Sequence, residues 1–151
     1  MPSESSHIDV ANCNQATVKF LVLNDFAAHL PWIGTIAFYK ALHVVEAVLA
    51  NSFSSHPTTH YSRNHFLATE NRLKKIYTHY IPLYAMSQKA RYLSHCSERS
   101  GVVRFIDHID QKAMSKVYLL HHLFQLEDSA QLFLSKSHGL DSISDLKPIL
   151  P

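Results

Sequence analysis

The sequence predicts an all-α protein, built as one four-to-five-helix up-and-down bundle. The chain has only 3 glycines and 6 prolines in 151 residues, so tight turns are few and a sandwich or barrel is disfavoured. Apolar residues recur with a helical period along most of the chain, and no segment alternates as a strand would. We expect one helical domain over residues 1–138, followed by a loosely docked tail over residues 139–151.

The first two helices are predicted on either side of a proline. The first runs from about Ile8 to Phe26, and Pro31 marks the break because proline disfavours the helical conformation at the preceding residue. The second, Trp32–Ala50, is apolar nearly all the way round, as a helix buried in a bundle is. A loop rich in small hydroxyl residues follows over residues 51–59.

The remaining helices are predicted from apolar periodicity. A third helix covers His60–Tyr80, and Pro82 starts a fourth that ends near Ser94. After a polar loop, a long final helix runs from Val102 to about Ser135, and Gly139 follows as a typical C-cap.

The apolar residues of the predicted final helix cover more of its surface than packing against one other helix would bury. Because these residues cover a wide arc of the helix, we expect a homodimer. The doublet His121-His122 is interpreted as surface or dimer interface. The apolar residues concerned are Leu119, Leu120, Leu123, Phe124 and Leu126.

Composition excludes several functional classes. The formal net charge of +2 is too small to indicate a nucleic-acid partner by itself, although 12 histidines are unusual. The N-terminus lacks a basic region before an apolar run, and no apolar stretch of about 18 residues is free of charge, so we expect a cytoplasmic protein without a membrane span. Cys13 and Cys96 show no CxxC pairing, which is compatible with free thiols or with one bridge.

Three polar side chains form a stripe on the apolar second helix. His43 lies about 40° round the helix from Tyr39, and Glu46 about 20° the other way. Burying such groups unpaired costs on the order of 2–7 kcal/mol each, so they need partners, a cleft or water. Two readings remain: a buried hydrogen-bond network, or a ligand-binding cleft in which Glu46 orients His43 and faces Arg63 or Arg91.

A histidine pair lies at the start of the third predicted helix. His56 and His60 are four residues apart, but Pro57 places His56 before the helix. No spacing here demands a metal, and we expect no cofactor. His60 is expected to cap or pack at the helix start, and Arg63 to pair with a carboxylate such as Glu46 or Glu70. A zinc site would need a third ligand from His65, Glu70 or Cys96.

Three segments carry a family resemblance: FYKALHVVEAVLA over residues 38–50, HPTTHYSRN over 56–64 and YIPLYAMSQKARY over 80–92. Together they resemble small bacterial and archaeal proteins of the HEPN superfamily, over residues 32–92. The resemblance implies a helical homodimer that binds RNA or a nucleotide. It also implies a metal-independent ribonuclease of toxin or defence type, and often a nucleotidyltransferase-type partner protein.

The HEPN hallmark is an arginine followed at a short spacing by a histidine. Arg63-Asn64 has the arginine and polar residue that begin this motif, but residues 68–70, where the histidine would stand, contain none. Arg72 and His79 fit the widest spacing that the motif allows, and they share a face if both lie on one helix. An arginine can hold phosphate bidentately and a histidine can move a proton at neutral pH. If the chain is such a ribonuclease, Arg72 or Arg63 would hold the phosphate, and His79 or His43 would move the proton. We expect ligand binding by Tyr39, Glu46, His60, Arg63 and Arg91.

The alternative function is a catalytically inactive helical dimerisation or interaction module. A ribonuclease should hold an arginine and a histidine together in an open cleft. A module should bury those groups in ion pairs.

Overall fold

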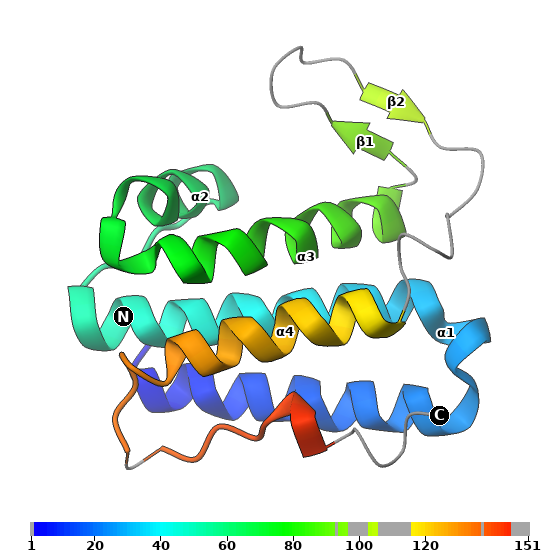
Figure 1. Ribbon diagram of the computed structural model, residues 1–151, viewed down its shortest axis with the longest axis horizontal. Helices are drawn as coiled ribbons and strands as arrows, with labels where there is room; N and C mark the ends of the chain where they lie inside the picture. Colours follow the sequence, from blue (N-terminus) through cyan, green and yellow to red (C-terminus); the bar gives the residue numbers. More distant parts are fainter. Residues whose placement is uncertain (1, 93, 97–102, 106–115, 137, 146–151) are drawn as a thin grey trace.

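The structure is a helical bundle, which confirms the predicted all-α class. The computed structural model describes residues 2–92, 94–96, 103–105, 116–136 and 138–145. Long helical segments pack side by side in it, and a small hairpin projects from one end (Figure 1). The helical elements in chain order are α1 (Glu4–Phe53), α2 (His60–Thr69), the short 3-10 helix η1 (Asn71–Leu73), α3 (Lys74–Tyr92) and α4 (Lys116–Ala130).

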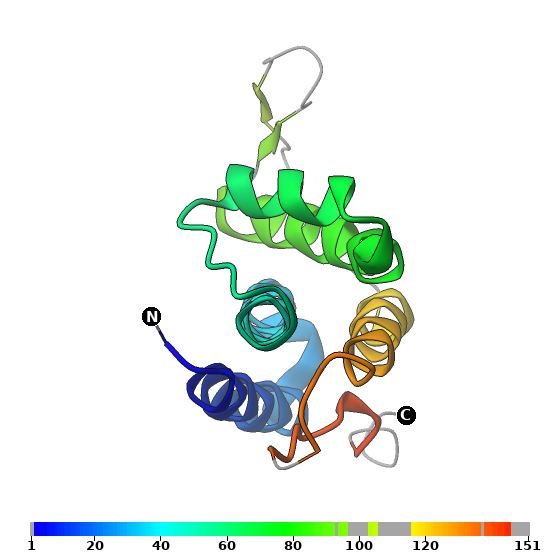
Figure 2. The ribbon, with the colours of Figure 1, turned by 90° about the vertical axis from the view of Figure 1, so that its left-hand side faces the viewer.

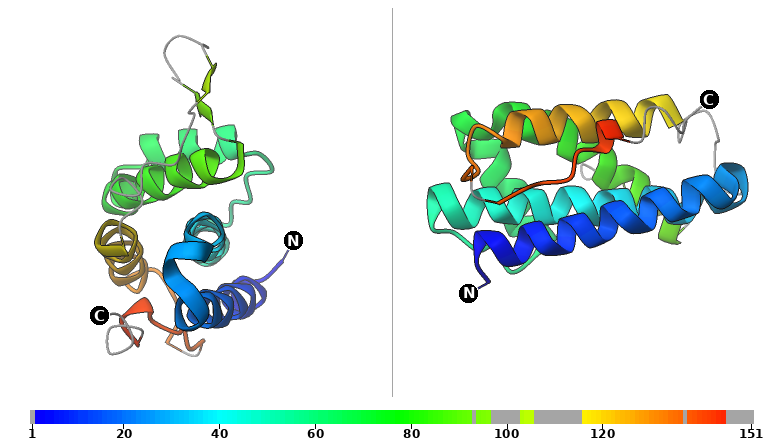
Figure 3. Two further views of the ribbon diagram at one scale, coloured as in Figure 1. Left: turned by 90° about the vertical axis from the view of Figure 1, so that its right-hand side faces the viewer. Right: turned by 90° about the horizontal axis from the view of Figure 1, so that it is seen from below.

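Helix α1 folds back on itself. Its assignment is continuous, yet the chain reverses direction around Pro31, giving a first arm (residues 4–24) and a second arm (residues 32–53) that run antiparallel (Figures 1 and 3). His7 contacts His43 across the arms at 3.1 Å between their Nδ1 atoms. A straight helix would separate these residues by roughly 54 Å. Proline favours a bend because it lacks the N–H and its ring crowds the preceding turn.

The expected helix break at Pro82 is wrong, because the chain breaks at Glu70 instead. Glu70 is extended (φ −82°, ψ 108°) and its carboxylate accepts a hydrogen bond from the backbone N–H of Arg72 at 3.1 Å. That side chain satisfies the start of the next helical turn. Pro82 lies inside α3, where burial of the neighbouring Tyr80 and Leu83 favours a continuous helix despite the lost hydrogen bond.

The final helix also begins later than predicted. Residues Val103–Phe105 form strand β2, which pairs antiparallel with β1 (Ser94–Cys96), placing Ser94 opposite Phe105. A short apolar run suits a strand as well as a helix, which explains the error. Helix α4 starts at Lys116, ends at Ala130, and the predicted helical residues 106–115 lie outside the described part of the chain.

The apolar arc of α4 is used within the chain. Helix α4 packs against both α3 and α1, so two of its faces are covered (Figure 2). Leu119, Leu123 and Leu126 are buried, and Leu120 and Phe124 pack against the core as partly buried side chains. The wide apolar arc of this helix therefore needs no second copy to explain it, and the homodimer stays a prediction.

Within the described part of the chain, one segment is long and apolar enough to cross a membrane by composition. It is His29–Phe53, and 72% of its most apolar window is buried inside the bundle. The segment also carries Lys40 and Glu46, whose charges are paired within the fold. These features fit the core helix of a soluble protein.

A buried ion pair lies where four parts of the chain meet. The Lys40 ammonium is 2.5 Å from a carboxylate oxygen of Glu127, and both side chains are at most 2% exposed. Lys40 also donates to Gln15 Oε1 on the first arm at 2.8 Å and to the Asp141 carbonyl at 2.7 Å. The other Glu127 oxygen accepts from the Ile143 backbone N–H. This network joins both arms of α1, α4 and the C-terminal tail.

The tail is held more firmly than expected over residues 139–145. Asn12 donates to the Gly139 carbonyl at 2.8 Å and accepts from the Asp141 N–H at 2.9 Å. Gln15 donates to the Ser142 carbonyl at 3.0 Å. Polar side chains of the first arm thus dock the tail. Residues 146–151 lie outside the described part.

Removing Lys40 should be costly. In Lys40→Met the Glu127 carboxylate stays buried without its cation, and we expect a loss of about 3–5 kcal/mol in the free energy of unfolding. The double variant Lys40→Met/Glu127→Leu should recover part of that loss, because neither buried charge remains. Urea unfolding followed by circular dichroism measures both. A double variant less stable than Lys40→Met would contradict this role.

Candidate functional site

A buried carboxylate organises the polar cluster around α2. Glu46, on the second arm of α1, is 2% exposed and accepts a charge-assisted hydrogen bond from Arg63 Nε. The Nδ1 atom of His56 lies 2.6 Å from the other Glu46 oxygen. Arg63 is itself only 7% exposed, and its Nη2 donates to the Pro57 carbonyl at 3.1 Å. The predicted pairing of Arg63 with Glu46 is present.

His60 connects this buried pair to the surface. It begins α2, whose Thr59 cap is satisfied by reciprocal hydrogen bonds with Ser62. The His60 Nδ1 atom lies 3.4 Å from Arg63 Nη1, and its ring lies 5.3 Å from that of Tyr84 between centroids. Burial lowers the pKa of His60, and the nearby charges of Arg63 and Arg91 lower it further. Its imidazole is therefore neutral at pH 7.

The cluster continues with Tyr39 of α1 and Arg91 of α3. Arg91 Nη1 donates to the Tyr39 hydroxyl at 3.1 Å, and the guanidinium carbon lies 5.5 Å from the centre of the Tyr39 ring. Arg91 Nε also donates to the Ser87 carbonyl at 3.3 Å. These contacts hold the guanidinium against an aromatic face.

A hollow of about 460 Å³ lies farther along the same pair of helices. Tyr61 and His65 stack beside it, with ring centroids 6.4 Å apart and planes at 9°. The Oδ1 atom of Asn64 is buried there without a hydrogen-bond partner in the described residues. The residues that line the hollow are Tyr61, Asn64, His65, Ala68 and Tyr77.

The hollow and the cluster both include residues of α2 and α3. On α3, Tyr77, Tyr84 and Arg91 recur every seven residues and so share a helix face. On α2, His60 and Asn64 are four apart and share another. Helix α2 lies alongside α3 (Figure 2). We call these residues together the α2–α3 face, and we include Tyr39 of α1 because it bonds Arg91. The face consists of Tyr39, His60, Tyr61, Asn64, His65, Tyr77, Tyr84 and Arg91.

His43 points from the stripe toward the first arm of α1. It contacts His7, and the His7 ring in turn meets that of His56 at 5.1 Å. Burial lowers the pKa of His7 and of His43. The three stripe residues therefore meet different partners: Arg91 for Tyr39, His7 for His43, and Arg63 with His56 for Glu46.

The sequence interpretation missed two kinds of polar residue in this region. His7 and Gln15 lie on the buried face of the first arm, in line with Ala11. Lys40 lies in the apolar second helix and is fully buried. The signal that identified the stripe, a polar side chain among apolar positions at helical spacing, applies to all of them.

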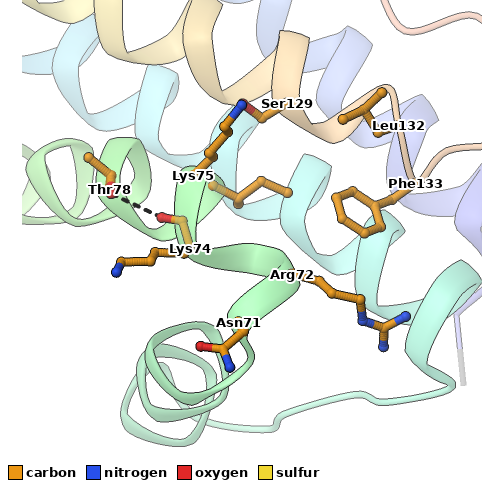
Figure 4. A pocket seen from close by; sticks show the side chains of 9 residues that line it. Asn71, Arg72, Lys74, Lys75, Thr78, Ser129, Leu132 and Phe133 are labelled. Atoms are coloured by element: carbon orange, nitrogen blue, oxygen red, sulfur yellow. Dashed lines mark hydrogen bonds between the residues drawn. The ribbon is translucent and has the colours of Figure 1, made fainter.

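Arg72 lies apart from this cluster. Its side chain is 62% exposed, bonds Glu70 at 3.2 Å, and covers the Phe53 ring at 4.3 Å. It lines a second hollow of about 580 Å³, whose lining includes no histidine. Figure 4 shows Arg72, Lys74 and Lys75 pointing in different directions there, so their charges do not converge.

His79 also has other partners than the expected arginine. Its Nδ1 atom lies 3.0 Å from Nδ1 of His122 on α4, and its ring meets that of His121 at 5.7 Å. Arg72 and His79 thus have separate sets of contacts. The expected catalytic pair is not assembled in this chain.

Two groups in the described residues have metal-ligand geometry. One is His7, Glu46 and His56, and the other is His79, His121 and His122. The trio considered from sequence, His56 with His60 and His65, is in neither arrangement, because His56 turns toward Glu46. In the first group Arg63 already pairs with Glu46, and its positive charge opposes a second cation.

The chain matches no family model, no curated protein and no solved structure. Membership of the HEPN superfamily therefore stays a prediction.

Acid should destabilise the native protein through its histidines. Burial is the main cause of the lowered pKa values of His7, His43 and His60, so the unfolded chain binds protons more tightly. Their stabilising contribution is fully present above about pH 6.5 and is lost as pH falls through the lowered native pKa values. Urea midpoints measured from about pH 7.5 to pH 5 should fall. His43→Gln should flatten this dependence, whereas the exposed His65→Gln should not.

Proposed function

We propose that this chain is a HEPN-like RNA- or nucleotide-binding protein whose ligand lies along the α2–α3 face. One observation carries the proposal. The residues expected to bind ligand, up to 52 positions apart in sequence, form a continuous chain of contacts. It runs from Glu46 through Arg63 to His60, then by ring contacts through Phe38 to Tyr39, whose hydroxyl accepts a hydrogen bond from Arg91.

The chemistry of this face suits single-stranded RNA. Aromatic rings at Tyr61 and Tyr77 offer surfaces on which unpaired bases stack. The Asn64 amide can pair with a base edge, because it has both donor and acceptor atoms. Arg91 supplies a planar guanidinium that suits a phosphate. Bases would occupy the hollow, with the backbone toward the Arg91 end.

Within this proposal, Glu46 and Arg63 position other groups and do not touch the ligand. Both are more than nine-tenths buried, and their ion pair anchors the start of α2 to the second arm of α1. Arg63 in turn lies against His60. The interaction-module alternative also expects such a buried ion pair, so the two functions separate only by a binding measurement.

Binding is tested by fluorescence anisotropy with a labelled single-stranded oligoribonucleotide. Arg91→Gln should weaken binding about 10-fold and reduce the salt dependence by about one phosphate contact. Tyr61→Ala should lose about 1–3 kcal/mol of stacking. The matched control is Arg72→Gln, which removes an exposed arginine outside the α2–α3 face and should bind normally. Equal losses in Arg91→Gln and Arg72→Gln would indicate nonspecific attraction and contradict the proposal.

Cleavage is tested separately with a mixed RNA ladder in EDTA. If the HEPN-like chemistry operates here, His60→Ala should abolish cleavage, because His60 is the histidine of the proposed face that contacts an arginine, and its lowered pKa suits a proton acceptor. His43→Ala and His79→Ala are the comparisons. Loss only in His79→Ala would instead restore the Arg72–His79 pair as the catalytic site. No cleavage by the wild type would favour a binding protein without ribonuclease activity.

The proposal extends to assembly and location. A homodimer, a cytoplasmic location and a nucleotidyltransferase-type partner are what the HEPN resemblance implies. The burial of His29–Phe53 inside the bundle is compatible with the location. Light scattering after size exclusion tests the dimer directly.

A further inference from the structure

Three histidines from two helices meet at the packed contact between α3 and α4. His79 belongs to α3, and His121 and His122 are consecutive residues of α4. The ring centroids of His121 and His122 are 5.3 Å apart, and His79 lies 5.7 Å from the first and 5.3 Å from the second. Both rings of the doublet therefore contact His79 on the neighbouring helix.

We propose that His79, His121 and His122 form a binding site for a divalent transition metal ion, with Zn²⁺ as the best fit. One ring nitrogen from each residue lies within 4.8 Å of the other two. In a tetrahedral site with Zn–N bonds of 2.0–2.1 Å, ligand nitrogens are about 3.3 Å apart. The 3.0 Å between the His79 and His122 Nδ1 atoms is close to this value. Small side-chain rotations would bring in the third ligand.

The surroundings of His79 and His122 favour the protonation state that a metal requires. Metal binding needs neutral imidazoles, and three imidazoles in contact resist taking up protons together. Burial is the first cause that lowers the pKa of His79, and burial with the two neighbouring imidazoles lowers that of His122 to about 4. At neutral pH a metal ion therefore does not have to displace a proton from an imidazolium at His79 or His122.

The location favours this trio over the other candidate group. His121 is exposed, so an ion has a path from solvent, and a water molecule can complete the coordination. The group around Glu46 is more deeply buried and already contains the Arg63 guanidinium. An ion at the three histidines would join α3 to α4 and leave the α2–α3 face untouched.

The test is calorimetric titration of Zn²⁺ into the full-length, tag-free protein after treatment with a chelator. We expect one ion per chain with a dissociation constant near or below about 1 μM. His121→Ala and His79→Ala should each weaken binding at least about 10-fold, because each removes one of three protein ligands. Circular dichroism confirms that the variants are folded. His121 is exposed, which makes its replacement compatible with the fold.

Matched controls identify the site. His65→Ala removes another exposed histidine and should leave zinc binding unchanged, and His56→Ala tests the group around Glu46. Co²⁺ in place of Zn²⁺ should give visible absorption that His121→Ala abolishes. No binding by the wild type, equal binding by wild type and both trio variants, or loss only in His56→Ala would each overturn the proposal. RNA binding in EDTA is independent of all these outcomes.

Discussion

The buried ion pair of Lys40 and Glu127 determines how the two arms of α1, helix α4 and the tail are positioned. Its geometry must be accurate, because a charge removed from water is tolerated only when its partner and hydrogen bonds are in place. Lys40 reaches α4, the first arm and the tail together, which fixes the rotation of the second arm about its axis. With Lys40 turned toward α4, the preceding residue Tyr39 points about 100° away and meets Arg91 on α3.

The sequence allowed the bundle to be predicted, but only part of its connectivity. Periodicity identifies which residues share a helix face, and this was sufficient for the apolar second helix and its polar stripe. It does not identify which element covers that face. The contact between His7 and His43 depends on the reversal of α1 near Pro31, which brings together residues 36 positions apart. Glu70 and Pro82 show a second limit. The helix predicted over residues 60–80 is interrupted at Glu70, where a side-chain cap and not a proline ends it, whereas α3 continues through Pro82 because its neighbours are buried.

The candidate site shows the same limit, because periodicity predicts contacts only for residues on one regular helix. Tyr39 and Glu46 have partners among the expected ligand-binding residues, Arg91 and Arg63, because both lie on the second arm of α1, where angular arguments hold. Arg72 and His79 do not meet, because their spacing of seven shares a face only on one continuous α-helix. Arg72 belongs to η1, which has 3.0 residues per turn, and Glu70 holds its guanidinium outward. Contact partners such as His56 depend on the loop before α2, which periodicity does not describe.

Electrostatics explains why the two arginines of the cluster have different roles. The Glu46 carboxylate compensates the charge of Arg63 inside the protein, where an uncompensated cation would be costly. Burial lowers the pKa of His7, His43 and His60 nearby, which favours their neutral forms. Arg91 lies in the last turn of α3, where the negative end of the helix dipole favours a cation. The positive potential of the α2–α3 face therefore comes from its Arg91 end, and an anionic ligand should be oriented with its phosphate there.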